Sequence, residues 1–195
     1  SPDLYSKKSR KKSISIKDVM TEGQEIVVQV NKDERGNKGA ALTTYLSLAG
    51  RYIVLMPNNK DGGGISRRVE GEERAQFKEV LSQVKVKKGM SVIGRTAGIG
   101  ASVEEIQWDL DYLNQLWAAI AGAAEAQSGA FLIYQESNLV VRAIRDYFNT
   151  DIEEIIIDKQ SIFDQAHQFM SHVMPNYAER IKFYDEEISL FTKYG

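Results

Sequence analysis

Hydrophobic side chains recur at intervals of three and four positions between residues 103 and 126, and this spacing predicts a long amphipathic helix. The stripe consists of Ile106, Leu110, Leu113, Trp117, Ile120 and Ala124. Directly before it, Ser102 is followed three positions later by Glu105, which is the pattern of a capping box. We therefore expect a helix that starts after Ser102 and buries one face.

Shorter stripes of the same period predict three more helices, and runs of β-branched and aromatic residues predict strands between them. The expected helices cover residues 72–84, 138–149 and 161–173. The expected strands cover residues 23–30, 41–48, 52–56, 91–96, 131–134, 155–157 and 181–184. From residue 129 onward strands and helices alternate, which favours a small parallel sheet.

Composition narrows the class of protein. A chain of 195 residues that is 43% hydrophobic can build one large domain or two to three small ones. No apolar run approaches the roughly 20 residues of a membrane span, and no leader combines a basic, an apolar and a small-residue region. The lack of cysteine excludes disulfides and agrees with a cytoplasmic location, and His167 and His172 are too few for a histidine-rich metal centre.

The net charge of −2 hides an uneven distribution. Basic side chains dominate the first half of the chain: Lys7, Lys8, Arg10, Lys11, Lys12, Lys32, Arg35, Lys38, Arg51, Lys60, Arg67, Arg68 and Arg95. Acidic side chains concentrate later: Asp109, Asp111, Asp151, Glu153, Glu154, Asp158, Asp185, Glu186 and Glu187. This asymmetry suggests a polyanion bound by the front half. The alternative for the run at residues 7–12 is a solvated tail.

The segment from Arg95 to Ser102 carries the clearest candidate chemistry. It places a guanidinium and the Thr96 hydroxyl at a strand end, followed by Gly98, Gly100 and a helix N-terminus. Free backbone N–H groups, the helix dipole and a fork-shaped cation together favour an anion such as phosphate. The alternative is an ordinary glycine turn with Arg95 in a surface ion pair. The segment is neither a P-loop nor a dinucleotide-binding GxGxxG motif.

Other basic residues are candidates for contacts with the phosphate backbone of a single strand. Lys32, Arg35 and Lys38 lie in the expected hairpin loop over residues 31–39, and Arg67 and Arg68 follow a glycine-rich turn. Each set is also compatible with a plain solvated surface. The acidic residues come in adjacent pairs, which point in different directions on a helix or strand and cannot share a metal ion. We therefore expect no catalytic constellation and no metal site in this chain.

Several longer stretches share their residues with one known family. They comprise residues 16–30, Arg35-Gly36-Asn37-Lys38-Gly39-Ala40-Ala41-Leu42-Thr43-Thr44, residues 47–52, Val54-Leu55-Met56-Pro57-Asn58-Asn59, residues 64–68, residues 95–97, Tyr134-Gln135-Glu136 and Arg142-Ala143-Ile144-Arg145-Asp146. The first stretch resembles the second half of an S1 RNA-binding domain, an OB-type barrel. Together the stretches resemble the ribonuclease E/G family, in particular its E branch in proteobacteria.

The resemblance implies a multi-domain α+β architecture. Its parts would be a basic flexible segment at 1–15, the C-terminal part of an S1 β-barrel at 16–49, an α/β 5′-sensor domain at 50–128, and part of an α/β RNase H-like domain at 129–195. It also implies a single-strand-specific endoribonuclease of RNA processing and mRNA decay that prefers a 5′-monophosphate. Arg95, Thr96, Gly50 and Val54 would fall on its 5′-phosphate pocket, and Lys38 on a position that holds RNA.

The resemblance further implies what this chain lacks. The family's DNase I-like domain, whose paired aspartates hold Mg²⁺, and the cysteines that bind Zn²⁺ between subunits would belong to the parent enzyme outside this chain. We therefore expect the chain to bind single-stranded RNA without cleaving it. The parent would be a cytoplasmic homotetramer in an RNA-decay assembly, with an association to the inner membrane but no membrane span in this chain and no affinity for DNA. The alternative is a non-catalytic RNA-binding regulatory module on the same scaffold.

Overall fold

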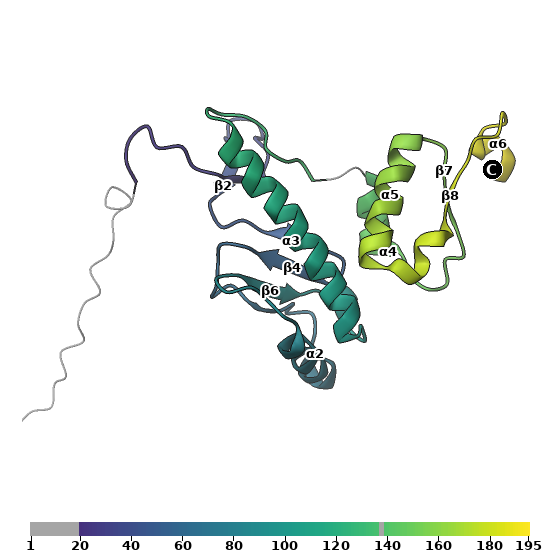
Figure 1. Ribbon diagram of the computed structural model, residues 1–195, viewed down its shortest axis with the longest axis horizontal. Helices are drawn as coiled ribbons and strands as arrows, with labels where there is room; N and C mark the ends of the chain where they lie inside the picture. The colour runs from purple at the N-terminus through teal and green to yellow at the C-terminus, as the bar shows by residue number, and fades with distance from the viewer. Residues whose placement is uncertain (1–19, 137–138) are drawn as a thin grey trace, which may run out of the picture.

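The computed structural model of the chain describes residues 20–136 and 139–195. The predicted basic segment at 1–15 lies outside these residues, as do residues 16–19 of the S1-like stretch. The described part is a mixed α+β structure with three small sheets, and its two hydrophobic cores occupy different parts of the chain (Figure 1). This confirms the α+β class, whereas the division into S1, sensor and RNase H-like parts stays a prediction.

The first sheet is a short antiparallel hairpin of β1 (Gln29–Lys32) and β2 (Ala41–Thr43). The prediction of a strand over residues 23–30 is therefore wrong for most of its length. A strand forms only where a neighbour can accept its backbone hydrogen bonds, and β2 is the only strand paired with β1 among the described residues. This sheet closes no barrel in the described part of the chain.

The predicted strand over residues 41–48 is interrupted between β2 and β3 (Leu48–Ala49). The interruption has a specific cause, because side chains replace the strand ladder there. The Asn58 side chain accepts a hydrogen bond from the Leu46 backbone N–H and donates one to the Thr44 carbonyl. The Gln29 side chain also bonds the backbone of Ser47, at 2.8 and 3.0 Å. Backbone groups that side chains satisfy in this way have no need of a strand partner.

The second sheet holds four strands in the order β3, β4 (Ile53–Met56), β6 (Ser91–Gly94) and β5 (Gly64–Ile65). β4 runs antiparallel to β6, and the predicted strands at 52–56 and 91–96 are confirmed with slightly shorter bounds. Ile53 lies opposite Gly94, so the backbone that follows β6 reaches the residues that precede β4. This register positions the candidate site.

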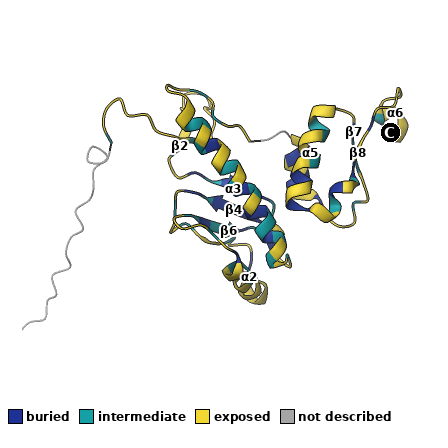
Figure 2. Ribbon diagram, in the orientation of Figure 1, coloured by how far each residue is buried: buried dark blue, intermediate teal, exposed yellow. Residues whose placement is uncertain are grey.

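Two helices cover this sheet. α2 (Gly71–Gln83) and α3 (Val103–Ala126) match the predicted helices, and Ser102 and Glu105 form the expected capping box. α3 runs across the strands, as Figure 1 shows. The buried stripe of α3 packs against the sheet and α2 to form the first core, and Figure 2 shows the buried face of α3 in dark blue. The fully buried residues of this core include Ile53, Leu55, Ile106, Leu110 and Leu113.

The remaining elements build a second core. They are α4 (Leu139–Tyr147), β7 (Ile155–Ile157), α5 (Gln160–Val173), the 3-10 helix η2 (Pro175–Arg180) and β8 (Ile181–Phe183). The short helix α6 (Leu190–Tyr194) follows and contributes no buried residue. β7 and β8 are parallel and α5 connects them, as predicted. α5 also contacts α3, where the rings of Phe169 and Tyr112 meet edge to face at 5.4 Å between centroids.

The prediction of a strand at 131–134 is wrong, so the parallel sheet has two strands among the described residues instead of three. Residues 131–136 run without regular structure, although Ile133 packs against the first core. An apolar run can thus be used for packing without a strand partner. None of the helices in the described residues combines the length and the apolar character needed to cross a bilayer.

Candidate functional site

Arg95 and Thr96 lie directly after β6, at the end of the four-stranded sheet. The Arg95 backbone N–H donates to the Tyr52 carbonyl at 2.8 Å, which extends the pairing of β4 and β6 by one residue. The 3-10 turn η1 (Thr96–Gly98) follows, and Thr96 is exposed on it. The Phe77 ring fills the space behind the turn, because a Cβ on Gly94 or Gly98 would lie 2.5 Å from it. α2 therefore fixes the path of the loop.

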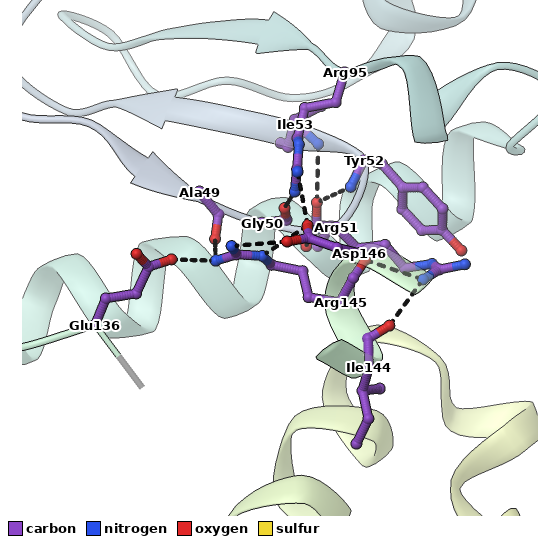
Figure 3. Close-up of polar contacts among 11 residues, drawn as sticks. Ala49, Gly50, Arg51, Tyr52, Ile53, Arg95, Glu136, Ile144, Arg145 and Asp146 are labelled. Carbon is purple, nitrogen blue, oxygen red and sulfur yellow. Dashed lines mark hydrogen bonds and ion pairs between the residues drawn. The ribbon is translucent and has the colours of Figure 1, made fainter. Parts of the chain in front are cut away.

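The Arg95 guanidinium has two partners on different elements. Nη1 donates to the Gly50 carbonyl, and Nη2 donates to Oδ1 of Asp146 on α4 at 2.7 Å (Figure 3). The Arg95 side chain keeps 28% of its surface exposed. The surface ion pair that we considered for Arg95 is thus present, and more than a quarter of the Arg95 side-chain surface remains open to solvent.

The sequence places four residues in the candidate phosphate pocket, and the structure brings them to one region of the sheet. Gly50 contacts Arg95 through its carbonyl, and Thr96 is next to Arg95 in the chain. Val54 lies on β4 opposite Ile93 of β6, and its side chain is half-buried. The strand register therefore accounts for the proximity of residues that lie more than 40 positions apart.

Asp109 on α3 holds the backbone next to this site through its carboxylate. Its Oδ1 accepts the backbone N–H of Arg51 at 3.0 Å, and its Oδ2 accepts those of Tyr52 and Ile53 at 2.8 and 3.1 Å. The carboxyl is fully buried. Burial raises the pKa of Asp109 to about 6, although the three backbone hydrogen bonds and the charge of Arg95 act in the opposite direction.

In the sequence, Asp109 stands out only as one of many acidic residues. A signal for it was present, because Asp109 lies three positions after Ile106 and next to Leu110, on the apolar face of the predicted helix. A carboxylate on a buried face needs partners, and the N–H groups that precede β4 are those partners. Its role is to position the chain at Gly50.

Gly50 has no room for a side chain, because a Cβ there would lie 2.4 and 2.5 Å from the two Asp109 carboxylate oxygens. We expect Gly50→Ala to lower the free energy of unfolding by about 2 kcal/mol, as overpacking of a rigid site does. Urea unfolding measures this change. Gly122→Ala on α3 is the control, because nothing lies within 4 Å of its Cβ position and alanine favours helix, so it should stabilise slightly. Equal effects at both positions would contradict the prediction.

Two further arginines join the site to α4. Arg145 donates to Glu136, to the Ala49 carbonyl at 3.2 Å and to Asp146 at 3.2 Å. Arg51 donates to the carbonyls of Ile144 and Arg145 at 3.2 and 3.1 Å (Figure 3), and to that of Phe148 at 2.5 Å. The sheet end and the C-terminal end of α4 therefore form one polar junction, which the sequence did not indicate.

The other predicted RNA contacts lie on different elements. Lys32 ends β1, and Arg35 and Lys38 face each other across the hairpin turn through backbone hydrogen bonds of 2.9 and 3.1 Å. All three side chains are exposed. Arg67 and Arg68 are exposed between β5 and α2. Arg67 also lines a depression of about 360 Å³ together with Arg74.

The described residues contain no group of side chains suited to hold a metal ion. Within residues 20–136 and 139–195, no three His, Cys, Asp or Glu side chains gather in a way that could hold an ion. The carboxylate of Asp109 is instead engaged by backbone N–H groups, and that of Asp146 by Arg95 and Arg145. The expectation that Mg²⁺ and Zn²⁺ are held by other parts of the parent enzyme stays a prediction.

The fold and the site define a mixed α+β protein with a polar junction between a sheet and a helix. Comparison with known proteins gives its family. Residues 47–195 match the Ribonuclease E/G family, and the chain belongs to this family. The match covers the four-stranded sheet, the candidate site and the C-terminal unit, and it confirms the resemblance inferred from the sequence.

Individual relatives agree with this assignment. The chain is 54% identical over 180 residues to Ribonuclease E of Haemophilus influenzae, which is 92% of this chain and 19% of that protein. It is 52% identical over 181 residues to Ribonuclease E of Escherichia coli, or 92% of this chain and 17% of that protein. Ribonuclease G of Haemophilus influenzae is 37% identical over 182 residues, or 93% of this chain and 37% of that protein. The chain thus spans about a fifth of the ribonuclease E relatives.

Proposed function

We propose that this chain is the RNA-binding and 5′-monophosphate-sensing portion of a bacterial single-strand-specific endoribonuclease of RNA processing and mRNA decay. The observation that carries the proposal is the Arg95 side chain, which is anchored at the sheet end by the Gly50 carbonyl, remains partly exposed, and is followed in the chain by the exposed Thr96. The names and the identity of the relatives support the endoribonuclease class.

The chemistry of the site suits a terminal phosphate. A guanidinium offers parallel N–H donors that match two phosphate oxygens, and a threonine hydroxyl can donate to a third. Asp109 fixes the backbone on one side of Arg95, and Phe77 fixes the turn on the other. A site of this kind is preorganised, so less binding energy is lost in ordering it.

The exposed cations away from Arg95 would hold the RNA chain. Lys32, Arg35 and Lys38 on the hairpin, with Arg67 and Arg68 before α2, can contact phosphodiesters without regard to base sequence. Such contacts release counterions and make binding weaken with salt. In this proposal they supply general affinity for single-stranded RNA, and Arg95 with Thr96, Gly50 and Val54 recognises the 5′ end.

Hydrolysis is proposed for the parent enzyme through residues outside this chain. The described residues offer no ligand set for Mg²⁺ or Zn²⁺, so no catalytic step is assigned to them. We propose that Mg²⁺ serves the parent's hydrolytic centre and Zn²⁺ its subunit contacts. The homotetrameric state, the RNA-decay assembly and the cytoplasmic location are likewise proposals for the parent.

Fluorescence anisotropy with one short RNA, carrying either a 5′-monophosphate or a 5′-hydroxyl, tests the sensing role. The chain should bind the phosphorylated RNA about tenfold more tightly, because a charge-assisted bidentate contact contributes on the order of 1.4 kcal/mol. Arg95→Ala should remove this preference and leave binding of the hydroxyl form nearly unchanged.

The matched control is Arg142→Ala, which removes the same charge from an exposed position on α4. It should lower the affinity for both RNAs equally. A preference for the 5′-phosphate that survives in Arg95→Ala would refute the proposed site. An Arg142→Ala variant that also loses the preference would show that net charge, and not the Arg95 geometry, is responsible.

A further inference from the structure

The Arg95 guanidinium already holds an anion of this chain. Asp146, near the end of α4, places Oδ1 2.7 Å from Nη2 of Arg95. The side chains of Arg95 and Asp146 keep 28% and 29% of their surfaces exposed, so an anion from solvent can reach the same contact. A phosphate that used both outer nitrogens of Arg95 would need the position that the carboxylate occupies.

The contacts of Arg95 allow such an exchange without loss of the arginine's position. Nη1 donates to the Gly50 carbonyl, and this hydrogen bond does not involve Asp146. Gly50 is itself fixed, because the neighbouring backbone N–H groups bind Asp109. Arg95 therefore keeps one anchor when its other partner changes.

The Asp146 carboxylate also has a second partner, Arg145, with which it can stay paired when it leaves Arg95. Arg145 donates through Nε to Oδ1 at 3.2 Å and through Nη2 to Oδ2 at 3.4 Å. Partial burial opposes ionisation of Asp146, but the hydrogen bonds and charges of Arg145 and Arg95 outweigh it and lower its pKa. The carboxylate is therefore charged at neutral pH and competes with other anions at Arg95.

We propose that Asp146 is an intramolecular competitor for the phosphate at Arg95. The carboxylate occupies Nη2 in the free protein, and a 5′-terminal phosphate must displace it toward Arg145 in order to bind. Asp146 would thus act through Arg95, because it occupies one of the guanidinium donors and so weakens binding of the phosphate. This inference rests on the proposed phosphate site and adds the group that sets its affinity.

A competing role and a supporting role of Asp146 predict opposite changes in the affinity for phosphorylated RNA when Asp146 is replaced. If Asp146 only held Arg95 in place, its removal would loosen the guanidinium and weaken binding of phosphorylated RNA. If it competes, Asp146→Asn should tighten binding of 5′-monophosphate RNA about fivefold, the equivalent of one exposed ion pair. Binding of 5′-hydroxyl RNA should stay the same, because that RNA does not need Nη2.

Anisotropy titrations of the full 195-residue chain and its variants separate these cases. Glu136→Gln is the matched control, because Glu136 loses the same charge and contacts Arg145 but has no contact with Arg95 among the described hydrogen bonds and ion pairs. It should leave the ratio of the two affinities at the value of the parent chain. Inorganic phosphate used as a competitor of phosphorylated RNA should inhibit Asp146→Asn at about fivefold lower concentration, since it carries no RNA chain.

A gain confined to phosphorylated RNA and inorganic phosphate supports the competitor, because loss of packing cannot produce it. Unchanged or weaker phosphate binding by Asp146→Asn, with a circular dichroism spectrum like that of the parent chain, overturns it. The test of the competitor and the test of the proposed function can fail independently. A parent chain without 5′ preference would contradict the proposed sensor, yet a preference that emerges in Asp146→Asn would still support the competitor.

Discussion

Replacement of Asp109 by alanine should lower the free energy of unfolding by about 4 kcal/mol, because the backbone N–H groups of Arg51, Tyr52 and Ile53 would lose the carboxylate that accepts from them. Each of these groups lies in a half-buried or buried segment where water cannot replace the carboxylate fully. Urea unfolding at neutral pH, followed by the fluorescence of Trp108 and Trp117 on α3, measures the loss.

Asp111→Ala is the matched control for this prediction. Asp111 lies on the same helix, is exposed, and accepts one hydrogen bond from Gln107 at 2.9 Å. Its removal should change the free energy of unfolding by less than about 0.5 kcal/mol. Similar losses in the two variants would show that the charge of α3, and not the buried contact, stabilises the fold.

The raised pKa of Asp109 adds a dependence on pH with a definite sign. Its pKa rises from 3.8 to about 6 on folding, so the folded protein holds this proton more tightly than the unfolded chain. The associated stability is complete below pH 3.8 and is lost as pH rises through 6, by about 3 kcal/mol. The side chain of Asp109→Asn cannot titrate. The difference in the free energy of unfolding between this variant and the parent chain should therefore change by most of this amount between pH 4 and pH 7.

Asp146 does not disturb this comparison, although its pKa is lowered. A lowered pKa gives stability that is present at neutral pH and lost as pH falls, which is the opposite sign to that of Asp109. Because Asp146 is present in both proteins, its contribution cancels in their difference. Parallel curves of stability against pH for the parent chain and Asp109→Asn would contradict the assignment.

Arg51→Met should cost about 3 kcal/mol of folding free energy and loosen the C-terminal end of α4. The guanidinium donates to three carbonyls at the C-terminal end of α4, those of Ile144, Arg145 and Phe148. The Ile144 carbonyl also accepts the Phe148 backbone N–H at 3.1 Å. It also lies over the rings of Tyr52 and Phe148 at 5.3 and 5.7 Å. Methionine keeps most of the side-chain volume and removes only the donors and the charge.

Hydrogen exchange of the α4 amides together with urea unfolding would test this role. Arg74→Met is the matched control, because Arg74 also donates to three carbonyls but is exposed. Its loss should cost well under 1 kcal/mol, since water can replace an exposed donor. We expect faster exchange of the α4 amides in Arg51→Met but not in Arg74→Met. Unchanged exchange in Arg51→Met would show that other contacts stabilise the end of α4.

The elements that the sequence predicts well are those with a local signal. The stripe from Ile106 to Ala124 and the capping box at Ser102 give α3 its observed bounds. The strand prediction failed where partners decide the outcome, at residues 23–28 and 131–134. An apolar pattern records which side chains are buried, but it does not record whether a neighbouring strand exists.

The site shows the same division. Arg95 and Thr96 are evident from their position between a strand and a capped helix. Their partners are not, because Gly50 and Asp146 lie 45 and 51 positions away in the chain. Such pairings arise from the register of β4 against β6 and from the packing of α4, and no periodicity within one segment contains that information.

The polar junction has a consequence for proton balance. The junction holds three arginines, Arg51, Arg95 and Arg145, and three carboxyl groups, those of Asp109, Glu136 and Asp146, so the formal charges of these six residues cancel. An anion that enters at Arg95 leaves this set with excess negative charge. Asp109 is the member best able to respond, because burial has already brought its pKa to about 6 and the charge of Arg95 holds it from rising further. If an anion binds at Arg95 as we propose, its charge would favour the protonated form of Asp109, and we expect proton uptake to accompany binding.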